Sequence, residues 1–170
     1  LEGRAFSKRS LITHAGVTLS STLLGFAIGT ALGILLAVAI VHWRVWDMSV
    51  MPWAIASQTI PILALAPMII VVLNSVGVSG LLPKALISAY LSFFPVVVGV
   101  VTGLRSPART DLDLLATYGA TPAQTFWKLR LPASVPYLFT SLKVGVAASL
   151  VGAIVAELPT GAVAGLGARL

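Results

Sequence analysis

The stretch GVTLSSTLLGFAIGTALGILLAVAIV, residues 16–41, contains no Asp, Glu, Lys or Arg. A helix needs roughly 20 apolar residues to cross about 30 Å of hydrocarbon, so this stretch is long enough to span a membrane. Its glycines at positions 25, 29 and 33 recur every fourth residue and therefore share one helix face. A face of small residues lets a second helix approach closely. The stretch predicts a membrane-spanning helix that packs through its glycines.

The rest of the chain has a similar composition. Of its 170 residues, 58% are hydrophobic and 9% are charged, with a formal net charge of +6 and no cysteine. A soluble domain carries about 25% charged residues and a disordered chain few apolar ones, so both classes are excluded. Three further stretches are long and apolar enough to cross a membrane, at 53–73, 85–104 and 137–158. The predicted fold is an all-α polytopic membrane helix bundle with about four membrane helices.

Some residues of these stretches are typical of a transport path. Pro61 and Pro67 interrupt helical hydrogen bonding just after Gln58. Broken helices often line cavities in transporters, although a kink satisfied by neighbouring helices is an alternative. Phe94 either faces such a path or packs against other helices. Glu157 is an ionisable group near membrane depth, which makes it a candidate gate, or else a helix-end carboxylate in the interface.

Residues 105–136, RSPARTDLDLLATYGATPAQTFWKLRLPASVP, interrupt the apolar pattern with charges and prolines. The local signals predict two short helices. Thr110 is expected to cap the first, Gly119 to end it in the left-handed conformation, and Thr121 to cap the second. Pro132 is expected to end the second helix. Both helices are amphipathic, so the pair either lies on the lipid interface or docks into a groove of a soluble partner.

The same segment resembles the EAA loop of ABC-importer permeases. The resemblance rests on the acidic Asp113, the Gly119-Ala120-Thr121 core and the Leu131-Pro132 pair. The family favours Glu followed by two Ala at the start of this loop, where the chain has Asp113, Leu114 and Leu115. Other parts of the chain also look like the family, namely Gly25-Phe26, Ile60-Pro61, Ala66-Pro67, Phe93-Phe94-Pro95, Glu157 and Gly165-Leu166-Gly167. The subgroup it looks most like handles nitrate, sulfonates and taurine, and includes permeases for thiamine-precursor pyrimidines.

The resemblance implies a transport subunit and not an enzyme. It implies a multi-pass inner-membrane protein that moves a small solute, such as a sulfonate, nitrate, taurine or a pyrimidine-type compound, in an ATP-driven importer. Residues 105–136, hereafter the coupling segment, would insert into a groove of a separate cytoplasmic ATPase subunit, which would bind the ATP and Mg. A second, identical permease subunit and an extracytoplasmic solute-binding protein complete the expected assembly. The residues expected at the ATPase contact are Asp113, Leu114, Leu115, Tyr118, Gly119, Ala120, Thr121, Phe126, Leu131 and Pro132.

The residues expected along the translocation path are Gln58, Pro61, Pro67, Phe94 and Glu157. The chain has no GxxxxGK[ST] motif, so ATP is expected on a partner and no cofactor on this chain. His14 and His42 are isolated from other ligand-type residues, so no metal site is predicted. Counting basic residues in the loops does not orient the chain.

Two other functions fit the same composition: a membrane scaffold or assembly subunit without a transport path, and a fragment of a secondary transporter. The solute is left open. Because the family core has five membrane helices and four are predicted here, we expect a fragment that lacks a final span and, at its N-terminus, a first one.

Overall fold

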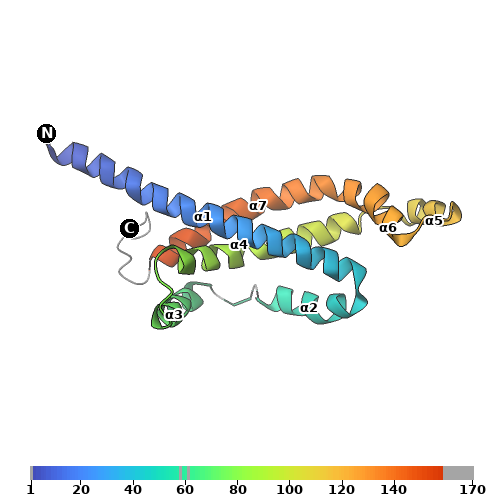
Figure 1. Cartoon of the computed structure of the whole chain (residues 1–170), viewed down its shortest axis with the longest axis horizontal. Coiled ribbons are helices and arrows are strands. Elements are labelled where there is room, and N and C mark those ends of the chain that lie inside the picture. The colour runs from blue at the N-terminus through green and yellow to red at the C-terminus, as the bar shows by residue number, and fades with distance from the viewer. Residues whose placement is uncertain (1, 58, 61, 159–170) are drawn as a thin grey trace.

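The computed structural model describes residues 2–57, 59–60 and 62–158, and all regular structure in these ranges is helical. In chain order the elements are α1 (Glu2–His42), α2 (Arg44–Ser57), α3 (Ile62–Ser75), α4 (Leu81–Leu104), α5 (Arg109–Thr117), α6 (Pro122–Thr125), the π-helix η1 (Phe126–Arg130) and α7 (Leu131–Glu157). The long helices α1, α4 and α7 pack side by side, and α5 and α6 project from one end (Figure 1). The prediction of an all-α helix bundle is confirmed.

Small residues bring the three long helices together. A Cβ atom built on Gly25 would lie 2.5 Å from the Ser88 Cβ, and one on Gly29 would lie 2.7 Å from the Ala89 carbonyl oxygen, so α1 touches the α4 backbone along the predicted glycine face. A Cβ on Gly152 of α7 would lie 2.8 Å from the Ser88 Cα. Such contacts are possible only without a side chain, and the resulting close approach holds membrane helices together.

An apolar core fills the half of the bundle nearest α5 and α6. It consists of buried residues from α1, α4 and η1, namely Ala37, Ile40, Val96, Val97, Val100, Val101, Leu104 and Phe126. Partly buried side chains from α2 and α7, among them Met51 and Leu138, pack against it. The coupling segment is therefore anchored to the same core that joins the membrane helices.

The expected second span, 53–73, is not one helix. It is divided between α2 and α3, which have 14 residues each, and neither is long enough to cross the hydrocarbon. Gln58 and Pro61 lie outside the described residues. The Tyr90 hydroxyl of α4 donates to the Ser57 carbonyl at 2.5 Å, which satisfies an acceptor at the end of α2. Within the described part of the chain, three helical stretches are long and apolar enough to span a membrane, not four: Ile12–His42, Leu81–Leu104 and Pro122–Glu157.

The expected break at Pro132 is also absent. From Pro122 to Glu157 the chain is helical without interruption, passing from α6 through η1 into α7. Pro132 stands in the first turn of α7, and the Leu131 N–H just before it donates to the Phe126 carbonyl, five residues back. This bond spans five residues, as in a π-helix, in place of the usual four. The hydrogen-bond pattern therefore shifts by one residue just before Pro132, which has no N–H to donate. The coupling segment and the last span therefore share one continuous helix.

Candidate functional site

The first helix of the coupling segment begins earlier than predicted. Its N-cap is Ala108, whose backbone is extended, and the N–H groups of Asp111 and Leu112 both donate to the Ala108 carbonyl, at 3.1 and 3.3 Å. Thr110 therefore lies inside the first turn, and the prediction that it caps this helix is wrong. Asp111 in this turn complements the positive end of the helix dipole.

The turn between α5 and α6 follows the prediction closely. Gly119 has a φ of +71°, and its N–H donates to the Ala116 carbonyl, while the Ala120 N–H donates to the Leu115 carbonyl, both at 3.0 Å. This pair of bonds is the Schellman motif, in which a left-handed glycine ends a helix.

Thr121 begins α6 with a complete capping box. Its N–H donates to Gln124 Oε1 at 2.9 Å, and the Gln124 N–H donates to Thr121 Oγ1 at 3.2 Å. Pro122 occupies the first helical turn, where its missing N–H costs nothing. The Gly119 turn and the Thr121 cap are both confirmed, and together they fix the direction in which the helix pair projects.

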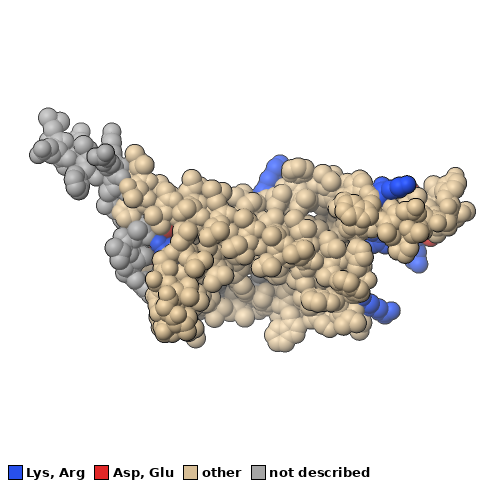
Figure 2. All heavy atoms as spheres, in the orientation of Figure 1, with Lys and Arg blue, Asp and Glu red and all other residues tan. Residues whose placement is uncertain are grey.

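The projecting helix pair leaves large apolar side chains uncovered. Leu114 is 55% exposed, Tyr118 78% and Trp127 65%, and no residue of α5 is buried. Figure 2 shows Lys and Arg side chains gathered at this end of the molecule. The basic residues of the elements that meet there are Arg44, Arg105, Arg109, Lys128 and Arg130. An exposed apolar patch rimmed by charge is typical of a protein-binding surface.

Phe126 is the exception among the residues predicted to contact an ATPase. It is 9% exposed, and its ring lies 4.8 Å, centroid to centroid, from the His42 ring at the end of α1. Leu131 is partly buried against the same core. These two side chains pack against the core of the bundle and so anchor the coupling segment to it. Of the other residues in that set, Asp113, Leu114, Tyr118, Gly119, Thr121 and Pro132 are exposed, and Leu115 and Ala120 are partly exposed.

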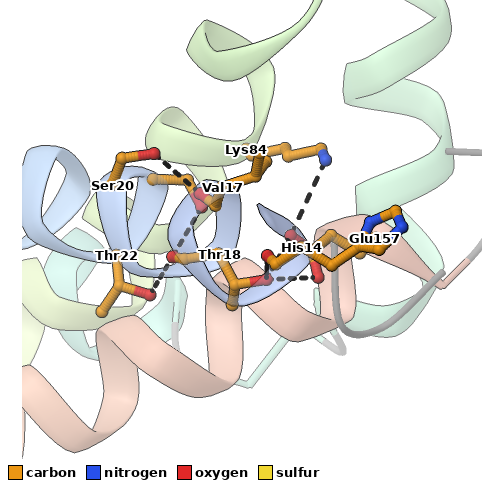
Figure 3. Close-up of polar contacts among 8 residues, drawn as sticks. His14, Val17, Thr18, Ser20, Thr22, Lys84 and Glu157 are labelled. Atoms are coloured by element: carbon orange, nitrogen blue, oxygen red, sulfur yellow. Dashed lines mark hydrogen bonds and ion pairs between the residues drawn. The ribbon is translucent and has the colours of Figure 1, made fainter. Parts of the chain in front are cut away.

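A second group of polar side chains lies at the opposite end of the bundle, where it joins the three long helices (Figure 3). Glu157 of α7 is 1% exposed, and its two carboxylate oxygens accept from the Thr18 hydroxyl of α1 at 2.9 and 3.0 Å. Lys84 of α4 places its Nζ 3.7 Å from Glu157 Oε1. Glu157, the last residue of α7, is thus a buried, paired carboxylate that connects α1, α4 and α7.

A set of hydroxyl contacts continues this connection along the bundle. The Ser149 hydroxyl of α7 donates to the Thr22 carbonyl of α1 at 2.8 Å, and the Ser88 hydroxyl of α4 donates to the Ser149 carbonyl at 2.6 Å. Thr22 and Ser88 lie one turn beyond Thr18 and Lys84 on their own helices. We call these six residues, Thr18, Thr22, Lys84, Ser88, Ser149 and Glu157, the polar cluster.

A groove of about 610 Å³ lies between α4 and α7. Its lining residues, which define the α4–α7 groove, are Phe94, Pro95, Val98, Gly99, Thr102, Pro136, Tyr137, Thr140, Ser141 and Val144. Phe94 is the predicted path residue that the structure places there. Glu157 belongs instead to the polar cluster, and Pro67 lies within α3. The structure therefore does not gather the described members of the predicted path into one site.

Sequence reasoning missed most residues of the polar cluster and the groove. Thr18, Thr22, Lys84, Ser88 and Ser149 are not among the residues that the sequence analysis names as candidates. A usable signal was present, because Thr18 and Thr22, like Lys84 and Ser88, are polar residues four apart in apolar stretches and so share a helix face. For the groove, Pro136 and the GxxxG pair at Gly99 and Gly103 marked the two helix faces that meet.

Comparison with known proteins identifies the class that this architecture represents. The family described as binding-protein-dependent transport system inner membrane component matches residues 29–170. The chain belongs to this family, and it is a membrane-embedded permease component of the ABC-importer type. No group of three or more His, Asp or Glu side chains suited to a metal occurs in the described ranges.

Individual relatives cover a range of named solutes. The formylaminopyrimidine transport permease protein ThiX of Halalkalibacterium halodurans is 36% identical over 161 residues, which are 95% of this chain and 62% of that protein. The riboflavin transport system permease protein RibX of Chloroflexus aurantiacus is 33% identical over 98% of this chain and 60% of its own length. The nitrate import permease protein NrtB of Leptolyngbya laminosa is 27% identical over 79% of this chain and 46% of its own length. The chain therefore spans less than two thirds of the length of each of these proteins.

Proposed function

We propose that the chain is the membrane-spanning permease subunit of an ATP-driven importer that moves a small solute across the inner membrane. In this proposal the coupling segment binds a separate cytoplasmic ATPase, which holds the ATP and Mg. A second copy of the permease and an extracytoplasmic solute-binding protein complete the assembly. Membership of the permease family supports the general class, and the geometry of the coupling segment supports the mode of coupling.

The observation that carries the proposal is the continuous helix from Pro122 to Glu157. One end of this helix adjoins exposed apolar side chains at Leu114 and Tyr118, which an ATPase groove would cover. The other end holds the polar cluster. A helix transmits an axial displacement along its length because each turn is hydrogen-bonded to the next. Movement of the ATPase would therefore reach the far end of the bundle without crossing a flexible joint.

The α4–α7 groove is the part of the solute path that we assign to this chain. It opens beside α7, the helix that the coupling segment extends, so a displacement of α7 relative to α4 would change its width. Phe94 is the residue of the predicted path that lines it. The relatives' names include both N-heterocycles and nitrate, so kinship alone leaves the solute undecided.

The contact with the ATPase can be tested at Gly119 with a matched control at Gly77. Both glycines have a positive φ, +71° and +82°, both lie in turns, and a Cβ on either would meet no atom within 4 Å. Gly119→Val and Gly77→Val therefore impose the same kind of backbone strain, but only Gly119 lies in the coupling segment. We expect Gly119→Val to lower the amount of ATPase that co-purifies with the permease by about tenfold.

The companion variant Gly119→Asn separates strain from contact, because Asn tolerates the left-handed conformation. We expect it to retain more ATPase than Gly119→Val. Equal co-purification in Gly119→Val, Gly77→Val and the unmodified protein would show that the coupling segment is not the ATPase contact.

A further inference from the structure

The α4–α7 groove carries no charged side chain. None of its ten lining residues is Asp, Glu, Lys, Arg or His, and most of its surface is apolar. An ion that leaves water for such a surface loses hydration without gaining a partner, at a cost of several kcal/mol. The groove therefore discriminates against nitrate, sulfonates and other free anions. Lys143 is exposed and precedes the lining residue Val144, but it is not itself part of the lining.

The hydroxyl groups of the groove are arranged as acceptors. The Thr102 hydroxyl donates to the Val98 carbonyl at 2.7 Å, and the Thr140 hydroxyl donates to the Pro136 carbonyl at 3.0 Å. The Ser141 hydroxyl donates to a carbonyl of its own helix in the same way, at 2.8 Å. Each hydroxyl has one proton and two lone pairs, so these three oxygens are left with lone pairs for a ligand. A ligand that donates hydrogen bonds suits them.

Two prolines add to the same imbalance between donors and acceptors. Pro95 of α4 and Pro136 of α7 both line the groove. Because proline has no N–H, neither residue can donate to the carbonyl four residues before it, which belongs to Leu91 and Pro132 respectively. Pro95 and Pro136 therefore contribute carbonyl acceptors but no N–H donor to the groove walls, which again favours a ligand that supplies N–H groups.

The shape and size of the groove suit a flat molecule. Phe94 of α4 and Tyr137 of α7 contribute aromatic side chains from its two walls. Aromatic faces stack on planar rings. A volume of about 610 Å³ falls within the range of roughly 300–1,000 Å³ that is typical of small-molecule sites.

We infer that the α4–α7 groove binds an uncharged, planar nitrogen heterocycle that carries N–H donors, and that this is the class of solute that the permease moves. This inference rests on the proposed transport function and selects among the solute types that the family resemblance left open. Acceptors and aromatic faces are contributed by the protein, and the donors by the ligand.

The test measures binding of radiolabelled cytosine and adenine to the complete purified transporter in detergent. Both probes are flat, uncharged at neutral pH and carry an amino group. 1,3-Dimethyluracil serves as a flat, uncharged competitor without N–H donors, and nitrate and taurine serve as charged competitors. We expect saturable binding of at least one labelled probe, displaced by its unlabelled form and not by the three competitors.

Variants of the groove locate the binding. Thr102→Trp places a large side chain at an exposed position in the groove, so we expect it to abolish binding. Val151→Trp is the matched control, because Val151 is an exposed residue of α7 outside the groove. Thr140→Val removes one acceptor at nearly constant volume, and we expect about fivefold weaker binding.

Several results would overturn the inference: no binding of either probe, displacement by nitrate or by 1,3-dimethyluracil, or binding that Thr102→Trp leaves unchanged. A Thr102→Trp variant that alters the permease's oligomeric state would also overturn it, because the groove would then be a contact between copies. Co-purification of the ATPase is followed in the same preparations. If the ATPase remains bound while the probes do not bind, the groove assignment fails and the transport function stands.

Discussion

Two regions of the molecule contain prolines within apolar sequence, and they fold differently. In the region 44–75, helix α2 ends at Ser57 and α3 begins at Ile62. In the region 122–157, a single helix passes through Pro132 and Pro136 without interruption. The presence of prolines in an apolar stretch therefore does not decide whether a membrane helix is broken.

The difference follows from how much each region packs against the rest of the bundle. Helix α7 lies along both α1 and α4, and residues from Ser134 to Glu157 are buried at intervals along it. In α2 the only buried residue is Ala54. Packing against neighbouring helices compensates for the hydrogen bonds that proline removes, and α2 has few neighbours to supply this compensation. At about 1.5 Å per residue, the 36 residues from Pro122 to Glu157 form a rod of about 54 Å.

The largest effect is expected where the continuous helix meets α4 most closely. In Gly152→Leu the new Cβ would lie 2.8 Å from the Ser88 Cα, which is a backbone atom that no rotamer change can move. Helices α4 and α7 would have to separate, breaking the hydrogen bond from Ser88 to the Ser149 carbonyl. We expect the free energy of unfolding to fall by about 3 kcal/mol or more. The measurement is the fraction of the protein that elutes as a monodisperse folded species in size-exclusion chromatography.

Gly16→Leu is the control for Gly152→Leu, since a Cβ on Gly16 meets nothing within 4 Å. It should behave like the unmodified protein. If Gly152→Leu were as stable as Gly16→Leu, close packing would not be what keeps the proline-containing helix continuous.

A smaller effect is expected at the buried ion pair that closes the far end of the same helix. Glu157→Leu leaves the Lys84 ammonium, whose side chain is 11% exposed, without the carboxylate. Breaking a buried pair in this way costs about 3–5 kcal/mol in soluble proteins, and we expect the lower end here because Lys84 has some access to water. The measurement is the thermal unfolding midpoint of the purified transporter.

The double variant Lys84→Met with Glu157→Leu distinguishes a structural role of Glu157 from a gating role. It removes both charges, so it should recover most of the lost stability. If stability recovers but solute uptake does not, Glu157 acts in gating as well. If Glu157→Leu alone changes the midpoint by no more than a typical surface substitution, the pair does not stabilise the bundle.

Some features of the fold could be predicted from the sequence alone, and others could not. The glycine face at positions 25, 29 and 33, the left-handed Gly119 and the capping box of Thr121 were all predictable, because each depends on local chemistry or on the helical period. The start of α5 at Ala108 was missed because a hydrogen-bonding side chain at Thr110 gave the stronger local signal. The continuity through Pro132 was missed because no local pattern indicates the π-type bond from Leu131 to Phe126, whose ring makes an edge-on contact with His42 at the end of α1.

The candidate sites also differ in how well the sequence predicts them, because some depend on local patterns and others on contacts between residues distant in the sequence. Exposure of Leu114 and Tyr118 follows from an amphipathic helix that projects from the bundle. The pairing of Glu157 with Lys84 and Thr18 joins residues more than sixty positions apart, and no local pattern specifies which helices meet. The burial of Phe126 likewise depends on the end of α1, far away in the sequence.

The smallest effect on stability, and the most direct test of the contrast between the two regions, comes from inserting flexible residues. A Gly-Gly insertion after Arg130 would interrupt the continuous helix within the coupling segment, where η1 passes into α7. The same insertion after Ile60, a described residue that lies outside the helices, falls between the end of α2 and the start of α3. Each inserted glycine costs about 1 kcal/mol in a helix and less in a loop, so both proteins should fold.

The two insertions should nevertheless differ in coupling. If the helix from Pro122 to Glu157 transmits the movement of the ATPase, the insertion after Arg130 should lower the amount of solute moved per ATP hydrolysed by about tenfold. ATP hydrolysis itself should continue. A tenfold change in this ratio corresponds to about 1.4 kcal/mol. The insertion after Ile60 should change this ratio by less than about twofold, because Ile60 lies outside the helix from Pro122 to Glu157 and outside α2 and α3. Equal ratios in the two proteins would mean that the continuity of the last helix, although present in the structure, is not what connects ATP hydrolysis to solute movement.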